Sequence, residues 1–256
     1  MSTPETEVKI AYQATNTLAL FHVDPSFQRV IRGPAGSGKS VGCLMESIRL
    51  CDMQPRQRDG IKRTRTLVVR NTYLELLNTT LKTFKTWLPS QVFTSRVSPT
   101  ITATLKIADM EIEYDFLSGD DDKRIRQLKS YECSNVYGNE VVELPKSLWD
   151  ACTRAVGRYP RVQDGGVARP CVYGDTNSCD LDHWLYHMAE VEKPRDFAMY
   201  AQPGAFLAIA KGKDGRLLYA PNPKAENIPN LEGGYDYYRR MMVGKKDSWI
   251  SVFILN

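Results

Sequence analysis

The segment that most constrains the fold is Gly33-Pro-Ala-Gly-Ser-Gly-Lys-Ser40, which matches the phosphate-loop pattern G-x-x-x-x-G-K-[ST] at every fixed position. An apolar segment, Phe27–Arg32, comes directly before it, and apolar residues at helical spacing follow it at Val41, Leu44, Met45 and Ile48. A strand, a glycine loop and a helix in this order bind phosphate, because the loop N–H groups and the positive helix N-terminus face the same anion. The sequence therefore predicts a P-loop nucleotide-binding fold.

Each residue type in this loop has a chemical reason. Gly36 and Gly38 let the backbone turn tightly, Lys39 carries charge for the β- and γ-phosphates, and the Ser40 hydroxyl is a ligand for Mg²⁺. We therefore expect ATP and Mg²⁺ as the cofactors. The alternative, a glycine-rich turn with an incidental lysine, leaves the flanking strand and helix unexplained. The expected phosphate-binding residues are Gly33, Pro34, Ala35, Gly36, Ser37, Gly38, Lys39 and Ser40.

Length and composition fit one α/β domain. The chain has 256 residues, 42% of them hydrophobic, which is enough to bury a full core. Its net charge of +4 permits an acidic partner such as nucleic acid without requiring one. The six cysteines form no C-x-x-C pair. His183 and His187 lack the further ligands that a metal site would need. No apolar run reaches the length of a membrane span, about 18 residues. We expect reduced thiols, structural histidines, a cytosolic protein and no membrane contact.

Strand and helix patterns alternate over residues 1–200. Period-two or buried-strand patterns at Thr66–Arg70, 101–116, Val136–Val142 and Pro170–Asp175, and a helical pattern over Leu74–Leu88, predict a mostly parallel central sheet with flanking helices. We expect residues 201–256 to form a small C-terminal lid subdomain appended to this core. It would contain a hairpin, Phe206–Ala210 with Leu217–Ala220 around Lys213-Asp-Gly215, and a final apolar strand, Trp249–Leu255.

Hydrolysis needs a residue that orients or deprotonates water at the tip of a neighbouring strand. Glu140, at the end of Ser134–Glu140, is the best candidate, and the alternative is a strand-end glutamate that faces solvent. The preceding residue is Asn139, where a P-loop ATPase usually carries an aspartate associated with Mg²⁺. The Asn139 carbonyl can accept a hydrogen bond from a metal-bound water but lacks the charge, which Asp175 could supply from the adjacent strand tip.

These residues resemble the ATPase domain of the large terminase subunit of tailed bacteriophages, the motor that packages genomic DNA. The resemblance covers nearly the whole chain and rests on ordered segments: residues 32–40, Arg70–Tyr73 with Thr79 and Thr80, Asn139–Glu140 with Leu144–Lys146, Val156–Pro160, Gly174–Asn177 and Asp182–Trp184. It implies a P-loop ATPase of the additional-strand, catalytic-glutamate (RecA-like) type. By this resemblance, Glu140 is the catalytic glutamate and Asp175-Thr176-Asn177 is the coupling motif that senses the γ-phosphate, the alternative being an Asp/Asn turn.

The resemblance also implies partners and a location. They are double-stranded DNA, the portal protein of a procapsid, a small terminase subunit, and further copies of the chain in a ring, within the host cell cytoplasm. Arg70 would contact nucleotide, although a helix N-terminus packed on the sheet explains it equally well. Large terminases normally carry a C-terminal nuclease domain, and nothing after Asn256 remains to build one. We therefore expect ATPase activity and no DNA cleavage.

The arginines depart from the family pattern. Many members place an arginine inside the phosphate loop, where this chain has Ala35, and Arg32 just upstream is a substitute. For DNA, the basic candidates are residues 56–65 and 211–216, with a solvated surface as the alternative. Candidates for an arginine finger or equivalent cation from a neighbouring subunit, each with a solvated surface charge as the alternative, are Arg124, Arg126, Lys129 and Arg158.

Two other functions are compatible with a phosphate loop. A nucleotide or small-molecule kinase would need an acceptor pocket and an arginine-rich lid, whereas Glu140 is placed as a water activator. A nucleotide-binding assembly scaffold would bind ATP without turning it over. A GTPase is disfavoured because no N-K-x-D motif occurs in the chain. We therefore predict an ATP-hydrolysing DNA-translocation motor.

Overall fold

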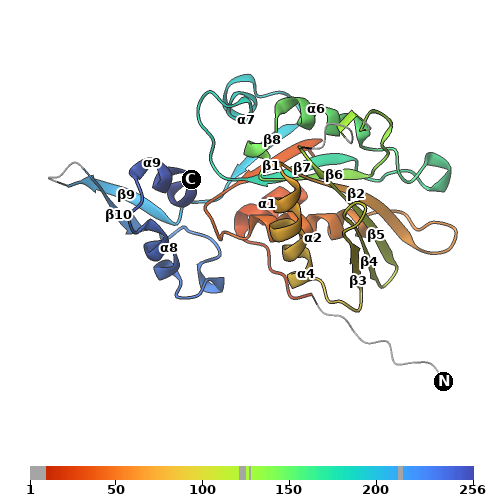
Figure 1. Cartoon of the computed structure of the whole chain (residues 1–256), viewed down its shortest axis with the longest axis horizontal. Helices are drawn as coiled ribbons and strands as arrows, with labels where there is room; N and C mark the ends of the chain where they lie inside the picture. The colour runs from red at the N-terminus through yellow and green to blue at the C-terminus, as the bar shows by residue number, and fades with distance from the viewer. Residues whose placement is uncertain (1–9, 121–124, 127, 213–215) are drawn as a thin grey trace.

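The computed structural model describes residues 10–120, 125–126, 128–212 and 216–256. An eight-stranded sheet forms its centre, with strands in the order β3-β4-β5-β2-β6-β7-β1-β8 (Figure 1). The run from β5 to β8 is parallel throughout, and β4 is antiparallel to both of its neighbours. The predicted α/β class with a mostly parallel sheet is therefore confirmed. The strands are β1 (Gln28–Arg32), β2 (Lys62–Arg70), β3 (Phe93–Arg96), β4 (Thr102–Ile107), β5 (Met110–Ser118), β6 (Asn135–Asn139), β7 (Cys171–Thr176) and β8 (Phe197–Ala201).

Helices cover both faces of this sheet (Figure 1). Successive strand residues point to opposite faces, so Ile31 joins one hydrophobic core and its neighbour Val30 joins the other. Phe21 is fully buried in the first core and Trp149 in the second. Coverage on both faces explains the near-continuous apolar strands that the sequence shows. The first face carries α1 (Asn16–Val23), α2 (Lys39–Asp52) and α4 (Leu81–Trp87), and the second carries α6 (Lys146–Ala155) and α7 (Trp184–Tyr186).

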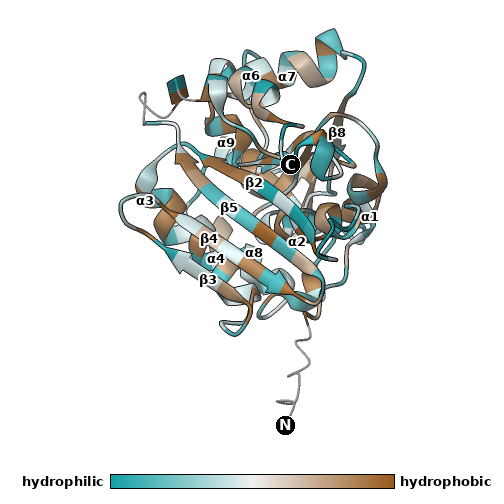
Figure 2. Ribbon diagram, turned by 90° about the vertical axis from the view of Figure 1, so that its right-hand side faces the viewer, coloured by the Kyte–Doolittle hydropathy of each residue, from teal (hydrophilic) through white to brown (hydrophobic). Residues whose placement is uncertain are grey.

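The hairpin predicted within residues 101–116 is formed by β4 and β5, which pair antiparallel with Leu105 opposite Ile112. The β5 strand alternates buried and partly exposed residues over much of its length, as its hydropathy bands show (Figure 2). On its other side, β5 pairs in parallel with β2 over the whole of β2. The hairpin thus extends the parallel sheet at the edge away from the phosphate loop.

The C-terminal residues form a smaller unit beside the sheet (Figure 1). It has a hydrophobic core of its own, centred on Phe206, Tyr238, Ile250 and Ile254. The predicted hairpin is confirmed, because β9 and β10 pair antiparallel, while Lys213-Asp-Gly215 lies outside the described residues. Its elements are β9 (Phe206–Lys211), β10 (Leu217–Pro221), α8 (Tyr235–Met242), α9 (Asp247–Ile250) and the π-helical turn η7 (Ser251–Leu255).

The predicted final strand Trp249–Leu255 is wrong, because this segment is helical in α9 and η7. A short apolar run does not distinguish a strand from a helix by its periodicity. Here Ile250 and Ile254 are spaced one helical turn apart and are both buried in the C-terminal core, whereas Ser251 faces solvent. Packing of one helical face against α8 and the hairpin therefore decided the conformation.

Three further segments differ from the sequence-based expectations. The strand predicted to reach Val142 ends at Asn139, because Glu140 has a left-handed backbone (φ 55°) and the 3₁₀ turn η3 (Val141–Glu143) follows. The helix predicted over Leu74–Leu88 consists of the short helix α3 (Tyr73–Glu75), the π-helical turn η1 (Leu76–Thr80) and α4. The basic residues 56–65, whose charge pattern is typical of a surface loop, are only partly a loop, because Lys62–Arg65 opens β2.

Packing of the C-terminal helix predicts a stability difference between two isoleucines. We expect Ile254→Ala, at a residue with 0% exposure, to lower the free energy of unfolding by about 2–5 kcal/mol because it leaves a cavity. The matched control is Ile209→Ala on β9, which is 62% exposed and should change stability by about 0.5 kcal/mol or less. Urea denaturation of the two variants measures the difference, and equal midpoints would contradict the described packing.

Candidate active site

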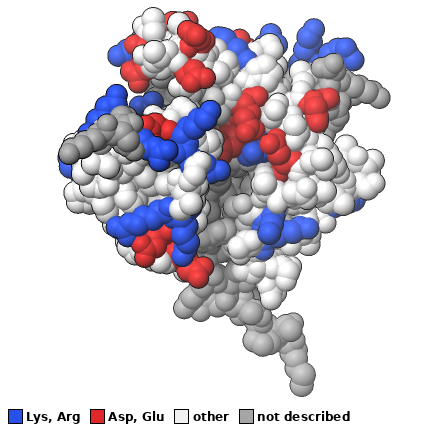
Figure 3. All heavy atoms as spheres, turned by 60° about the vertical axis from the view of Figure 1, so that its left-hand side comes forward, with Lys and Arg blue, Asp and Glu red and all other residues white. Residues whose placement is uncertain are grey.

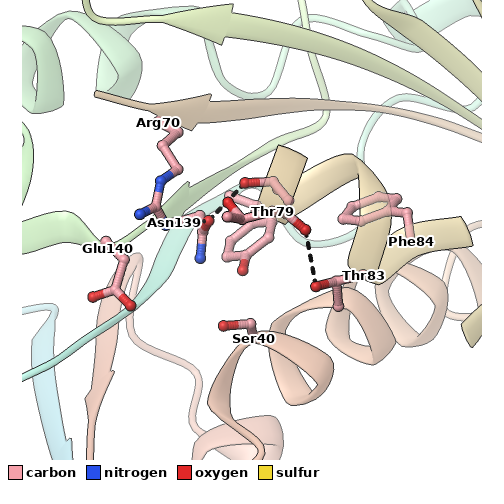
Figure 4. A pocket seen from close by; sticks show the side chains of 9 residues that line it. Ser40, Arg70, Thr79, Thr83, Phe84, Asn139 and Glu140 are labelled. Carbon is pink, nitrogen blue, oxygen red and sulfur yellow. Dashed lines mark hydrogen bonds between the residues drawn. The ribbon is translucent and has the colours of Figure 1, made fainter. Parts of the chain in front are cut away.

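The predicted site residues meet at the carboxyl ends of β1, β7 and β6. The additional strand β7 lies between the phosphate-loop strand β1 and the Glu140 strand β6. In this register Asn139 is opposite Asp175, and Arg32 is opposite Thr176. Because parallel strands end at the same edge of a sheet, polar residues far apart in the sequence face one space. Figure 4 shows Ser40 at the start of α2 facing Asn139 and Glu140 at the end of β6 across this space.

The phosphate loop has the backbone that its glycines predict. Gly36 (φ 75°) and Gly38 (φ 87°) are both left-handed, and α2 begins directly after Gly38. Lys39 is 6% exposed, and its ammonium donates hydrogen bonds to the carbonyl oxygens of Gly33 (2.8 Å) and Pro34 (2.9 Å). Burial lowers the pKa of Lys39, although the carboxylates of Glu140 and Asp175 oppose this shift. The loop thus holds a buried cation at its centre.

Asp175 connects the loop to the two neighbouring strands. Its carboxylate is fully buried and accepts hydrogen bonds from the Ser40 hydroxyl (2.6 Å), the Tyr137 hydroxyl (2.9 Å) and the Asn139 amide (3.0 Å). The carbonyl oxygen of Asn139 accepts from Thr80 Oγ1 (2.7 Å) and Arg70 Nη1 (2.8 Å). Asn139 therefore bridges a carboxylate and a guanidinium, a task that uses both the donor and the acceptor of an amide.

Glu140 is strained, partly buried and electrostatically perturbed. Its left-handed backbone is uncommon for a residue with a side chain, and such strain is concentrated at functional sites. Its carboxylate accepts a hydrogen bond from Asn177 Nδ2 (3.0 Å). Burial and the nearby Asp175 carboxylate raise the pKa of Glu140 to about 7, against the opposing effect of Lys39 and Arg70. This carboxyl group can therefore exchange a proton near neutral pH.

The three residues of the predicted coupling motif each hold a different part of the site. Asp175 binds the Ser40 hydroxyl, and Thr176 Oγ1 accepts the Val142 backbone N–H (3.1 Å) of the turn that follows Glu140. The Asn177 amide donates to Glu140, and its Oδ1 lies 3.4 Å from Lys39 Nζ. The coupling-motif positions thus contact both the phosphate loop and the Glu140 turn.

Arg70 lies on the far side of Asn139 from the phosphate loop. Besides its bond to Asn139, its Nη2 is 3.5 Å from Glu143 Oε2 and its Nε is 3.6 Å from Glu75 Oε2. It lines a cavity of about 210 Å³. The cavity is open to Ser40, Asn139 and Glu140, and the threonines of η1 and α4 form its opposite wall (Figure 4). Arg70 therefore faces the end of the phosphate site rather than the loop itself.

Sequence reasoning missed the residues that hold the loop from outside. Gln202, which follows β8, accepts the Ser37 hydroxyl hydrogen bond (2.7 Å). The Asn227 amide donates to the Gly36 carbonyl (2.7 Å), and the Ala35 backbone N–H donates to the Phe253 carbonyl (2.9 Å). These residues carry no motif, and only the tertiary structure brings them to the loop.

A second cavity, of about 650 Å³, lies beside Gly38 and Val41 at the start of α2. Its walls come from the N-terminal segment, α4 and the C-terminal subdomain, and they include the rings of Tyr12 and Trp87. Aromatic and amide side chains of this kind suit a planar heterocycle. No sequence motif indicated this cavity, because its residues are dispersed along the chain.

The other predicted cations lie in different places, Arg32 at the carboxyl end of β1 and Lys129 and Arg158 near the amino end of β6. Arg32 ends β1, and its buried Nε has no hydrogen-bond partner among the described residues. Arg126 is exposed, and Arg124 lies outside the described residues. Arg158 donates to the Lys129 carbonyl (3.5 Å), next to the Cys133 segment that precedes β6. Lys129 and Arg158 therefore lie near the amino end of β6, whereas Glu140 follows its carboxyl end.

His183 has a structural contact at the start of α7. The His183 Nδ1 accepts the backbone N–H of Leu185 at 3.1 Å, as the cap of α7. Within the described residues, no group of three or more His, Cys, Asp or Glu side chains could hold a metal ion. Over the same part of the chain, no helix has the length and hydrophobicity needed to cross a bilayer.

Three solved structures match this architecture over nearly the whole chain. The large terminase of a thermophilic bacteriophage superposes with a TM-score of 0.62 at 13% identity, covering 93% of this chain and 51% of its own. The chain has the fold of a large terminase ATPase domain. The HK97 bacteriophage large terminase gives 0.60 at 12% identity, with 95% and 50% covered. The Thermus phage P74-26 large terminase ATPase domain, solved as a point mutant, gives 0.55 at 12% identity, with 96% and 94% covered.

The chain spans about half the length of the thermophilic-phage and HK97 large terminases, and nearly all of the P74-26 ATPase domain. No protein-family model and no curated protein sequence matches it. At this identity the likeness shows the RecA-like terminase fold, so the resemblance that the motifs indicated is confirmed for the fold.

The raised pKa of Glu140 predicts a pH-dependent stability change. A carboxyl whose folded-state pKa is about 7, above the unfolded 4.5, binds more protons when folded, so stability falls as pH rises between these values. We expect Glu140→Gln to stabilise the protein at pH 8 by roughly 1–3 kcal/mol, and to have little effect at pH 4.5. Urea denaturation at both pH values measures this, with Glu232→Gln on an exposed segment as the control. A loss of stability at pH 8 would contradict the described environment.

Proposed function

We propose that this chain is the ATPase motor domain of a phage large terminase, which hydrolyses ATP to translocate double-stranded viral DNA into procapsids. The observation that carries the proposal is the placement of the Glu140 carboxylate, 3.0 Å from Asn177 Nδ2, beside the phosphate-loop Lys39. A carboxylate with a pKa of about 7, next to a phosphate loop, suits deprotonation of water. The terminase fold supports the motor role.

The phosphate loop would bind the triphosphate through its backbone N–H groups and the N-terminus of α2. Lys39 Nζ would exchange its bonds to the Gly33 and Pro34 carbonyls for bonds to the β- and γ-phosphate oxygens. The cavity next to Gly38, with Tyr12 and Trp87 in its walls, would take the adenine ring. The thermophilic-phage large terminase has been solved with ADP and with ATP-γ-S, which supports nucleotide binding by this fold.

In the hydrolysis step, a water attacks the γ-phosphorus and transfers a proton to the Glu140 carboxylate, while the bond from phosphorus to the β–γ bridging oxygen breaks. Asn177 orients Glu140 by its hydrogen bond and lies 3.4 Å from the Lys39 ammonium. Thr176 holds the turn after Glu140. Loss of the γ-phosphate would therefore change the contacts of residues 175–177, which lie at the carboxyl end of β7.

The fold family implies Mg²⁺ together with ATP, and the donor set of the site fits it. The Ser40 hydroxyl and the fully buried Asp175 carboxylate, 2.6 Å apart, are oxygen ligands of the kind that Mg²⁺ prefers. Asn139 would contact a metal-bound water by exchanging the hydrogen bond that its carbonyl oxygen accepts from Thr80. When bound, Mg²⁺ neutralises charge on the β- and γ-phosphates.

Two arginines take further roles in this proposal. Arg32 would reach the γ-phosphate as the substitute for the loop arginine, which its unpartnered buried Nε supports. Arg126, exposed before β6, would enter the site of a neighbouring subunit in a ring on the portal protein. A small terminase subunit would complete the assembly in the host cytoplasm.

We propose that residues 1–200 are the ATPase core and residues 201–256 are its lid subdomain.

The basic surface of the C-terminal subdomain is the better DNA candidate of the two predicted. Around residues 56–65, Arg56, Arg63 and Arg65 form ion pairs with Asp109, Asp59 and Glu113. On the C-terminal subdomain, exposed Lys and Arg side chains gather together (Figure 3). They belong to the hairpin, α8 and the turn after it: Lys211, Arg216, Arg239, Arg240, Lys245 and Lys246. Among them, Arg239 pairs with Asp236.

Replacement of the proposed base tests catalysis. We expect Glu140→Gln to bind ATP with at most a small change in affinity and to lower phosphate release by about 100-fold or more. The control Glu143→Gln removes a neighbouring, partly exposed carboxylate and should retain activity. The assay uses wild type and variants at high concentration with procapsids, because an arginine from a neighbour completes the site only in the assembly.

Two outcomes of that assay would overturn the proposal. ATP turnover that depends strictly on an added acceptor would identify a kinase. Nucleotide binding without turnover by concentrated wild type on procapsids would identify a binding scaffold.

The pH dependence of turnover gives an independent test. Because the base must be deprotonated, kcat/KM should rise with pH and level off above about 7, the pKa of Glu140 in the protein without nucleotide. Steady-state phosphate release from about pH 5.5 to about pH 9 brackets this pKa and measures the profile. A rate that is independent of pH in this range would show that Glu140 is not the base in the rate-limiting step.

A further inference from the structure

We propose that the carboxylate that binds Mg²⁺ in this site is Asp175 on β7, which lies one strand away from the more usual position for it, residue 139 on β6. The inference rests on the proposed function, and it assigns Asn139 as the residue that positions Asp175. The usual P-loop arrangement places this carboxylate directly before the catalytic glutamate, where the chain has an amide.

The first observation is the partner of the phosphate-loop hydroxyl. Ser40 Oγ donates to Asp175 Oδ2 at 2.6 Å, so the hydroxyl that faces the nucleotide is already paired with a carboxylate on β7. Glu140, the other acidic group at the loop, is engaged by Asn177. Asp175 is therefore the carboxylate positioned to share a cation with Ser40.

The second observation is the burial of Asp175 among neutral donors. The side chain has 0% exposure, and its hydrogen-bond donors in the described part of the chain are the hydroxyls of Ser40 and Tyr137 and the amide of Asn139. Burial of a carboxylate is unfavourable unless the carboxylate is paired with a cation. Lys39 is the ammonium that interacts with it, yet Lys39 Nζ donates its hydrogen bonds to Gly33, Pro34 and Asn177. Such a carboxylate is suited to a cation that arrives with the substrate.

The third observation explains why residue 139 is an amide. Asn139 and Asp175 are directly opposite in the parallel register, and the Asn139 nitrogen lies 3.0 Å from Asp175 Oδ1. An aspartate at 139 would place two carboxylates at this distance with no hydrogen between them to share, so they would repel each other instead of forming a hydrogen bond. The carbonyl of Asn139 is fixed in turn by Arg70 and Thr80. The amide therefore orients Asp175 towards Ser40.

The inference predicts that the carboxylate and the amide can be exchanged between positions 139 and 175. A double variant that makes this exchange tests the inference. Affinity for ATP-γ-S is measured by titration calorimetry with Mg²⁺ and with EDTA for the wild type, Asp175→Asn, Asn139→Asp and the double variant Asn139→Asp/Asp175→Asn. Binding of Mn²⁺ in place of Mg²⁺, followed by electron paramagnetic resonance, gives a readout that does not depend on turnover. Binding of ADP in EDTA checks that each variant retains its fold.

We expect Mg²⁺ to increase the affinity of the wild type for ATP-γ-S. In Asp175→Asn this Mg²⁺-dependent increase should be smaller by a factor of at least about 10. The double variant should recover most of the increase, because a carboxylate again faces Ser40. Asn139→Asp alone should weaken this increase, because the variant loses the hydrogen bond that orients Asp175 and places a second carboxylate against it. An Asp175→Asn variant that folds and keeps the full Mg²⁺-dependent increase would overturn the inference, as would a double variant no better than Asp175→Asn.

The outcomes separate this inference from the proposed function. If Mg²⁺ dependence follows Asp175 but the wild type hydrolyses no ATP on procapsids, the metal assignment stands and the motor proposal fails. If the wild type hydrolyses ATP but its Mg²⁺ dependence is unaffected by Asp175→Asn, the motor proposal stands and the metal assignment is wrong.

Discussion

The hydrogen bond from the Ser40 hydroxyl to the Asp175 carboxylate is the contact on which the candidate site depends. It joins the first turn of α2 to the end of β7, and the Asn139 amide extends the connection to β6. The phosphate loop, the additional strand and the Glu140 strand are therefore held in one hydrogen-bonded unit. This unit exists because three parallel strands end at the same edge of the sheet, where their last residues leave the apolar interior.

The strand ends at this site contain a strained backbone and a buried charge, and the packed interior of the sheet stabilises both. Glu140 has a left-handed backbone, and Asp175 is a carboxylate with no exposure to solvent. Both features are unfavourable in isolation. Gly138 and Gly174 let β6, β7 and the turn after Glu140 approach closely, since a Cβ on Gly174 would lie 2.4 Å from the Gly138 carbonyl oxygen. Apolar cores on both faces of these strands fix that approach.

The C-terminal subdomain is connected to the phosphate loop as well as to its own core. Gln202 and Asn227 bind the loop through side chains, and Phe253 binds it through its carbonyl oxygen. Gln202 also donates to Glu226, whose carboxylate accepts hydrogen bonds from Thr15 and Thr17 in the N-terminal segment. A change in the loop on nucleotide binding would therefore reach both the N-terminal segment and the subdomain that carries the basic surface. Such connectivity suits the motor role proposed above, in which hydrolysis is coupled to movement of a DNA-binding surface.

The sequence by itself determined the phosphate loop, the alternating α/β order and the parallel sheet, because each depends on local periodicity and on glycines at fixed spacing. It also indicated Glu140 and the polar residues at the end of β7. It could not determine the conformation of Trp249–Leu255, because a short apolar run fits a strand or a helix until its packing partner is known. Only the tertiary structure decided that Asp175 faces Ser40, that Asn139 bridges Asp175 to Arg70, and that Gln202 holds the loop. These contacts depend on the order and register of strands far apart in the chain, and local sequence patterns carry no information about which strand ends become neighbours.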